Sequence, residues 1–388
     1  MKKINWPLVI LAFFSLFCVG IIDNGRSSIY PDILRRLNLS YEQGSLIFSI
    51  SSITGLFSTL SARYWLPKYG IIIPQRLFSF ILLIASIIFG TSISYLPSYS
   101  LLLVGCALIG IGMGGLSITM NLSIDEAVPE EYRRKFLSGL HSLYGLSSGF
   151  APVILLFLTT WKKGFQELYL VISLFPIILL LLSFNKKKLT LIPKVASKDN
   201  VTANKSNFLS TLLTGSILSF YVCSEVALSS RFIIIAKSLT PLEGSASQSY
   251  LSVFFILLTF GRIIFAFIKT NKTNSAILFG SIFSSFTLFI LAILTKQTIF
   301  LSLIGLTMSI YFPCAMDLMA QIFKKELSKN LPAIMNIVTI KLIGMHFLAG
   351  SMEERFGPLS TLYFSIILLV FAIICLFLQK KSIKQILN

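Results

Sequence analysis

Polar side chains with possible chemical roles follow a long apolar stretch near the start of the chain. This stretch begins at Trp6, and its far end carries Asp23, Asn24, Arg26 and Tyr30. Asp23 and Arg26 are three residues apart, so on a helix they share a face and can form an ion pair. In one interpretation this pair only neutralises its own charge. In the other, Asp23 or Asn24 contacts a polar solute or a coupling proton, and Arg26 and Tyr30 belong to the same binding site.

A second carboxylate, Glu225, lies in another apolar stretch and has no basic residue three or four positions away. Its partner is therefore expected on a different helix, as Arg26 or Lys341, or farther along its own helix, as Arg231. Burial among apolar groups favours the protonated form of a carboxyl. Our first hypothesis is that Glu225 is the proton-coupling residue, with Asp23 as the other choice, and the alternative is a structural ion pair.

Four further residues are candidates for contact with a bound solute. His141 and Tyr144 are neighbours on one predicted helix, and an imidazole changes its charge near physiological pH. Hydrogen-bonded packing is the alternative for His141. Tyr221 lies one turn before Glu225, and Lys341 lies near the middle of a late helix, where its ammonium would meet an acidic residue or an anionic group of the solute.

Three polar residues toward the ends of predicted helices are expected to act in gating or packing: Arg262, Asp317 and Asn121. A charged side chain at the centre of a bilayer costs about 2.5–3.5 kcal/mol on insertion scales, so each charge requires a partner or water. The five cysteines lie inside apolar stretches, and the sequence has no spacing typical of metal ligands, a nucleophile triad or a nucleotide-binding loop. We therefore expect no metal, no cofactor and no enzyme activity.

The composition indicates that these residues are surrounded by lipid. The 388-residue chain is 55% apolar and 12% charged, with a mean hydropathy of +0.84. Apolar stretches of about twenty residues, the length that spans a bilayer as a helix, predict an all-α integral membrane protein with twelve helices. Their approximate ranges are 6–30, 45–65, 75–95, 100–122, 135–159, 167–184, 208–235, 247–268, 274–294, 298–322, 331–352 and 358–379.

The distribution of basic residues predicts the orientation of these helices. With both termini on the cytoplasmic side, that side carries a roughly threefold excess of Lys and Arg. This bias explains the net charge of +18 better than a nucleic-acid partner does. A basic stretch at 185–207 predicts a cytoplasmic linker between two six-helix bundles, 1–184 and 208–388, the second ending in a short cytoplasmic tail.

Polar landmarks recur in the two halves at intervals of about 200 residues, which indicates a duplication. Asp23 with its following serine pair matches Glu225 with its own, and His141 matches Lys341. Two short motifs also match, "QGS" at 43–45 with "EGS" at 243–245, and "TMNL" at 119–122 with "AMDL" at 315–318. Such repeats place a substrate site between the halves near the middle of the membrane. Asp23 and Glu225 would face each other across it.

The chain resembles the major facilitator superfamily of secondary transporters over essentially its whole length. The likeness rests on the two six-helix halves and on four segments: residues 110–152, "LTFGRI" at 258–263, "GLTMSIYFP" at 305–313 and "DNGRSSIYPDIL" at 23–34. Residues 110–152 look like the corresponding segment of sugar- and metabolite-type bacterial members. The loop after the second helix lacks the acidic residue of the family pattern. The fifth helix lacks the Gly-Pro pair of antiporters, which weakens an exporter interpretation.

The resemblance implies a monomeric transporter of the bacterial inner membrane that works by alternating access. Our leading hypothesis is proton-coupled symport of a small polar solute, with sugars ahead of organic anions. The expected partners are this solute, the proton and the lipid bilayer. The alternatives are an efflux carrier for amphipathic compounds working by antiport and a membrane receptor that binds its ligand without moving it.

Overall fold

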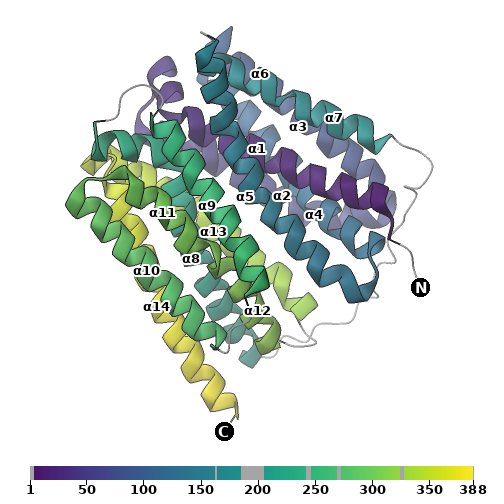
Figure 1. Ribbon diagram of the computed structural model, residues 1–388. Coiled ribbons are helices and arrows are strands. Elements are labelled where there is room, and N and C mark those ends of the chain that lie inside the picture. Colours follow the sequence, from purple (N-terminus) through teal and green to yellow (C-terminus); the bar gives the residue numbers. More distant parts are fainter. Residues whose placement is uncertain are drawn as a thin grey trace. The chain divides into compact units, whose positions relative to one another are not determined.

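The computed structural model describes residues 4–161, 164–184, 205–241, 246–268, 272–323 and 327–387. Within these ranges the regular structure is helical and no strand is found. The chain divides into two compact units, Met1–Ser197 and Lys198–Asn388 (Figure 1). Most of the linker predicted at 185–207 lies outside the described residues, so its boundaries stay a prediction.

The first unit contains seven α-helices and one short 3₁₀ helix in the described ranges: α1 (Trp6–Leu37), α2 (Tyr41–Tyr69), α3 (Ile72–Ser94), α4 (Tyr99–Ala127), α5 (Glu130–Thr160), η1 (Phe165–Glu167), α6 (Leu168–Ile172) and α7 (Leu174–Ser183). The described part of the second unit contains α8 (Lys205–Leu239), α9 (Ala246–Phe267), α10 (Asn274–Thr295), α11 (Thr298–Ser309), α12 (Tyr311–Phe323), α13 (Leu327–Phe356) and α14 (Ser360–Leu387).

Twelve helical segments among the described residues are long and apolar enough to cross a membrane, which confirms the predicted all-α fold. Several helices extend beyond their predicted ends. The first was expected to end at residue 30 and continues to Leu37, where Asn38 adopts the left-handed conformation that closes many helices. The next helix begins with a capping box, in which Ser40 and Gln43 each bond the other's backbone N–H.

Two predicted helices are interrupted, and a proline accounts for each break. Pro176 follows the end of α6 at Ile172 by four residues, and Pro313 follows the end of α11 at Ser309 by the same spacing. A proline ring clashes with the carbonyl four residues earlier and removes one helical hydrogen bond. The sixth span is therefore built from η1, α6 and α7, and the tenth from α11 and α12.

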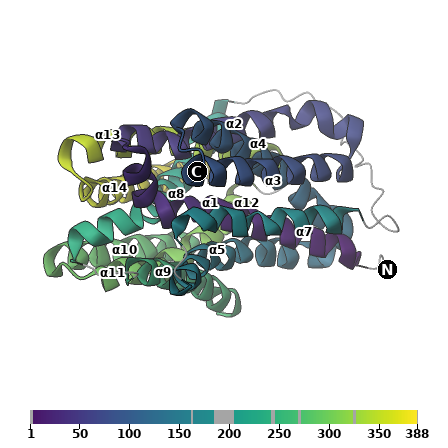
Figure 2. The same ribbon diagram turned by 90° about the horizontal axis from the view of Figure 1, so that it is seen from above.

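Corresponding helix pairs pack together in both units, although the most extensive contact of the second unit joins α8 with α14. In the first unit the most extensive contacts join α3 with α4, α2 with α4 and α1 with α5 (Figure 2). In the second, α10 packs on α11, α9 on α11 and α8 on α13, which are the corresponding pairs of spans. Glycine allows close approach in both. A Cβ on Gly110 would strike the carbonyl oxygen of Ser51, and one on Gly305 would strike that of Phe254.

Candidate functional site

The polar end of α1 forms a hydrogen-bonded network with α5. Asp23 is ion-paired with Arg26 on its own helix, as the spacing predicts. The second oxygen of Asp23 accepts a hydrogen bond of 2.6 Å from the Tyr144 hydroxyl. Asn24 donates to the same hydroxyl at 3.1 Å and to the Ser148 hydroxyl at 2.8 Å. The predicted residues Asp23, Asn24, Arg26 and Tyr144 therefore meet at one place inside the first unit.

Arg26 also fastens α1 to α2. Its Nη1 donates to the Ile47 carbonyl at 2.9 Å and to the Ser51 hydroxyl at 2.5 Å. The Ser51 hydroxyl lies 2.9 Å from the Cys106 carbonyl on α4. The guanidinium packs over the Phe48 ring, with Cζ 5.2 Å from its centroid. Arg26 is thus anchored by contacts outside its own helix. This arrangement suits a fixed counter-charge for Asp23 better than a side chain that moves to contact a solute.

Accessibility differs sharply between the two members of this pair. The Asp23 side chain is 27% exposed and that of Arg26 is 3% exposed. The carboxylate is therefore the more accessible group of this pair, and the guanidinium is enclosed.

The partner of Glu225 is Arg262 on α9, and none of the three basic residues expected from the sequence fills this role. The Glu225 Oε1 to Arg262 Nη2 distance is 3.5 Å, and both side chains are 11–14% exposed. The Arg262 Nε is buried and has no hydrogen-bond partner in the described structure. The Tyr221 hydroxyl also interacts with the Glu225 carboxylate, so the two acids differ chiefly in their ion pairs, of which the one at Glu225 is the longer.

Lys341 makes its contacts with α8. Its Nζ donates to the Ser216 hydroxyl at 2.8 Å and lies 3.7 Å from the centroid of the Phe220 ring, a cation–π arrangement. The side chain is partly exposed. No carboxylate in the described ranges forms an ion pair with it.

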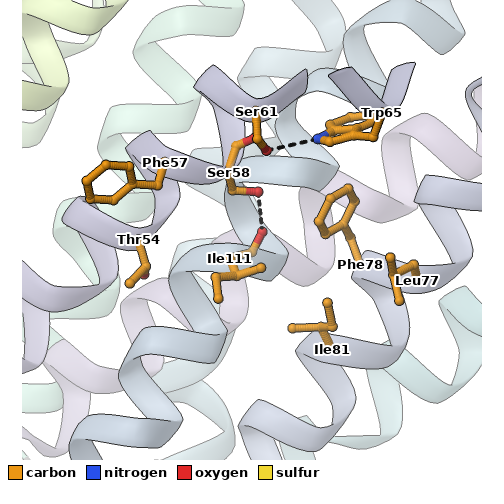
Figure 3. Close-up of a pocket in the computed structure, with 9 residues that line it drawn as sticks. All are labelled: Thr54, Phe57, Ser58, Ser61, Trp65, Leu77, Phe78, Ile81 and Ile111. Carbon is orange, nitrogen blue, oxygen red and sulfur yellow. Dashed lines mark hydrogen bonds between the residues drawn. The ribbon is translucent and has the colours of Figure 1, made fainter. Parts of the chain in front are cut away.

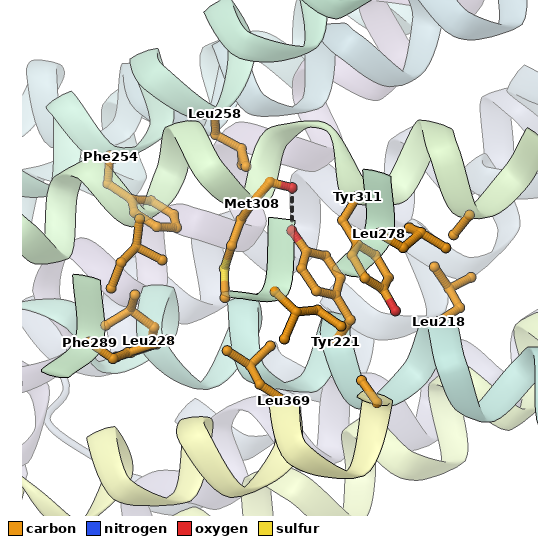
Figure 4. Close-up of a cluster of buried hydrophobic side chains, with 14 of the residues drawn as sticks. Leu218, Tyr221, Leu228, Phe254, Leu258, Leu278, Phe289, Met308, Tyr311 and Leu369 are labelled. Atoms are coloured by element: carbon orange, nitrogen blue, oxygen red, sulfur yellow. Dashed lines mark hydrogen bonds between the residues drawn. The ribbon is translucent and has the colours of Figure 1, made fainter. Parts of the chain in front are cut away.

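Two predicted binding residues are enclosed in the helix packing instead. Tyr221 is fully buried and stacks on Tyr311, with ring centroids 3.6 Å apart. Its hydroxyl donates to the Met308 carbonyl at the end of the first half of the tenth span (Figure 4). Tyr30 is also fully buried and packs edge-on against Phe48. In this conformation neither ring is available to a solute.

The remaining predicted residues lie near helix surfaces. His141 is partly exposed and precedes Tyr144 by one turn on α5. The Asn121 amide donates to the Ser117 carbonyl of its own helix at 2.7 Å. Asp317 accepts a 3.1 Å hydrogen bond from Asn274 at the start of α10. This contact joins two helices, and the gating or packing role of Asp317 stays a prediction.

Sequence reasoning missed a buried charge cluster that joins α8, α13 and α14. The Arg231 Nε donates to the Glu353 Oε2 at 2.9 Å, and both side chains are 0% exposed. Other bonds from Arg231 go to the His346 carbonyl at 3.2 Å and to the Ser230 hydroxyl at 3.0 Å. The second oxygen of Glu353 accepts from Thr361 at 2.7 Å. The predicted eleventh span stopped at residue 352, one position before the acid.

A groove of about 440 Å³ lies between α2, α3 and α4 (Figure 3). Most of its wall is apolar, and its hydroxyls are used locally. Ser58 donates to the Ile111 carbonyl, and Ser61 accepts from the Trp65 indole. The groove contains none of the predicted binding residues, and its lining is Thr54, Phe57, Ser58, Ser61, Trp65, Leu77, Phe78, Ile81 and Ile111. We therefore do not assign it to a polar solute.

Comparison with known proteins identifies the family. The model of the Major Facilitator Superfamily matches residues 12–340, so the chain belongs to this superfamily of transporters. This confirms the resemblance seen in the sequence. A search of curated proteins finds no match.

Solved structures agree on the fold. The crystal structure of a D-xylose-proton symporter is similar with a TM-score of 0.76 and 11% identity, covering 95% of this chain and 97% of its own. A bacterial homologue of the human lysosomal transporter Spinster, in an inward-facing and occupied conformation, has a TM-score of 0.70 and 14% identity. That match covers 97% of this chain and 96% of the other. At these identities the likeness concerns the fold.

Proposed function

We propose that this protein is a proton-coupled secondary transporter that moves a small polar solute by alternating access. Glu225 is the proton-carrying residue in this proposal. Asp23, Asn24, Tyr144 and Lys341 provide polar contacts to the solute. The fold is similar to that of a D-xylose-proton symporter, which agrees with the proton coupling proposed for this protein.

The observation that carries this proposal is the unequal binding of the two carboxylates. Hydrogen bonds and nearby cations favour the ionised form of a carboxyl, and their weakness favours protonation. Asp23 accepts from Arg26 and, at 2.6 Å, from Tyr144. Glu225 has a longer ion-pair contact, 3.5 Å, with Arg262, and the Tyr221 hydroxyl, which donates to the Met308 carbonyl, also interacts with this carboxylate. Protonating Glu225 therefore breaks a weaker ion pair than protonating Asp23 would, and it releases Arg262 from its contact with α8.

We propose further that the transporter is a monomer in a bacterial inner membrane with both termini in the cytoplasm, following the excess of basic residues on that side. A cysteine placed at residue 237 or 355, at the ends of α8 and α13, would be labelled from outside intact cells by a membrane-impermeant maleimide. Labelling from the cytoplasmic side alone would contradict this orientation.

The test uses purified protein in vesicles loaded with buffer and exposed to a soluble metabolite extract. Compounds that accumulate under an imposed pH gradient are identified by mass spectrometry. Glu225→Gln should abolish accumulation above equilibrium, yet retain exchange of the same compound across the membrane, because the amide keeps the shape of the side chain but cannot bind and release a proton. The matched control is Glu131→Gln, which alters an exposed acid at the start of α5.

The proton role fails if Glu225→Gln accumulates the compound at the wild-type rate with the wild-type dependence on pH. Loss of both accumulation and exchange would instead assign Glu225 to binding or folding. Accumulation of unrelated amphipathic compounds would favour the efflux alternative.

A further inference from the structure

Lys341 differs from the other described cations near the middle of the long helices. Arg26, Arg231 and Arg262 are each ion-paired with a carboxylate of their own unit. Lys341 occupies the centre of α13, and in the described part of the chain its polar contacts are the hydroxyl of Ser216 and the ring of Phe220. Neither contact neutralises its charge.

The surroundings of this ammonium leave room for another group. An ammonium has three donors, and Ser216 accepts one of them. Gly344 lies one turn later, on the same face of α13, and a Cβ built there would meet no atom within 4 Å. At Gly344 the surface of α13 is therefore not covered by described atoms of its own unit, whereas Gly215 and Gly305 in the same unit are tightly enclosed.

We propose that Lys341 binds a carboxylate or phosphate group of the transported solute. This inference rests on the proposed function and narrows its substrate class from polar solutes to anions, reversing the order favoured from the sequence. An isolated cation at mid-bilayer is costly and requires compensation. Sugar hydroxyls offer dipoles, whereas an anion supplies the missing charge and a charge-assisted hydrogen bond. Ser216 and the Phe220 ring hold the ammonium in position for it.

The binding experiment separates candidate solutes by their charge. A soluble metabolite extract is passed over an anion-exchange resin, which gives a bound, anionic fraction and an unbound fraction. Each fraction is added to purified protein, and the unfolding temperature is measured. The anionic fraction should stabilise the wild-type protein, and the unbound fraction should not. Treating the anionic fraction with a phosphatase distinguishes a phosphate ester from a carboxylate.

Three variants assign this effect to the ammonium. Lys341→Gln removes the charge, and the concentration of anionic fraction needed for half the stabilisation should rise about tenfold or more, as expected for loss of a hydrogen bond to a charged group. Lys341→Arg retains the charge and should keep most of the effect. Lys237→Gln removes an exposed lysine of the same unit and should behave as wild type.

Stabilisation by the unbound fraction, by neither fraction, or equally in Lys341→Gln would overturn the inference. Failure of the transport proposal would give a different experimental result. In that case the anionic fraction still stabilises the protein through Lys341, while the vesicles accumulate nothing under a pH gradient. If the solute accumulates and proves uncharged, transport is upheld and the anion site is refuted.

Discussion

Neutralising Glu353 should destabilise the second unit strongly. Arg231 and Glu353 are 2.9 Å apart with both side chains fully enclosed, and removal of one partner from such a pair typically costs about 3–5 kcal/mol. Glu353→Gln preserves the shape and leaves the Arg231 guanidinium buried without a counter-charge. Because arginine cannot lose its proton in a protein, changing the pH will not relieve this cost.

The reciprocal variant, Arg231→Met, should behave differently. It leaves a buried carboxyl that can become neutral by binding a proton, so its stability should rise as the pH is lowered. Replacing both residues, as in Arg231→Met with Glu353→Leu, removes both charges together. Paired apolar replacements of this kind are often neutral or stabilising, so the double variant should recover to within about 1 kcal/mol of wild type.

The natural cysteines provide the assay. Buried cysteines lie in both units, Cys18 and Cys106 in the first and Cys223 and Cys314 in the second, so a thiol-reactive fluorophore added during a thermal ramp reports on the unfolding of either unit. Glu131→Gln, an exposed acid in the first unit, is the control. The reasoning is refuted if Glu353→Gln has the same unfolding temperature as this control, or if the double variant has an unfolding temperature as low as that of Glu353→Gln.

Two further variants test the packing and the network of the first unit. Gly110→Ala should destabilise by about 1–3 kcal/mol, because its methyl group would strike the Ser51 carbonyl, whereas Gly280→Ala on α10 meets nothing within 4 Å and should be neutral or stabilising in the same thermal assay. Tyr144→Phe removes the hydroxyl that bonds both Asp23 and Asn24, and should cost about 1–3 kcal/mol. Tyr363→Phe, an exposed ring, is its control; equal unfolding temperatures for the two would show that the Tyr144 hydroxyl contributes nothing.

Local spacing was enough to predict one ion pair and the helices themselves. Asp23 and Arg26 are neighbours on one helix, so three residues of separation fix their contact. Apolar length likewise predicted each span. The breaks before Pro176 and Pro313 were missed because other prolines, such as Pro31, lie inside continuous helices. A proline in the sequence therefore does not show whether the helix will continue, because this depends on whether neighbouring groups bond the backbone carbonyl that loses its helical hydrogen bond.

Partners on different helices could not be predicted in the same way. Arg262 on α9 pairs with Glu225 on α8. Glu353 on α13 pairs with Arg231, which is also on α8. Hydropathy shows which face of a helix is polar, but not which helix packs against that face. The sequence analysis also missed the burial of Glu353 for a further reason. It lies at the end of an apolar stretch, where a charge is ordinarily assigned to water, and only the packing of α8 and α14 around it shows that it is buried.

The two units have the same neighbouring pairs of spans, but their acidic residues bind different partners. Corresponding spans are neighbours in both, and a carboxylate occupies a corresponding place on α1 and α8. In the first unit this carboxylate is held within its own helix and by Tyr144; in the second it reaches across to α9 with a longer contact. Close packing tolerates few changes in volume, whereas a polar group can change its partner by a single substitution on a facing helix. The two halves can therefore share one scaffold while their acids bind different partners.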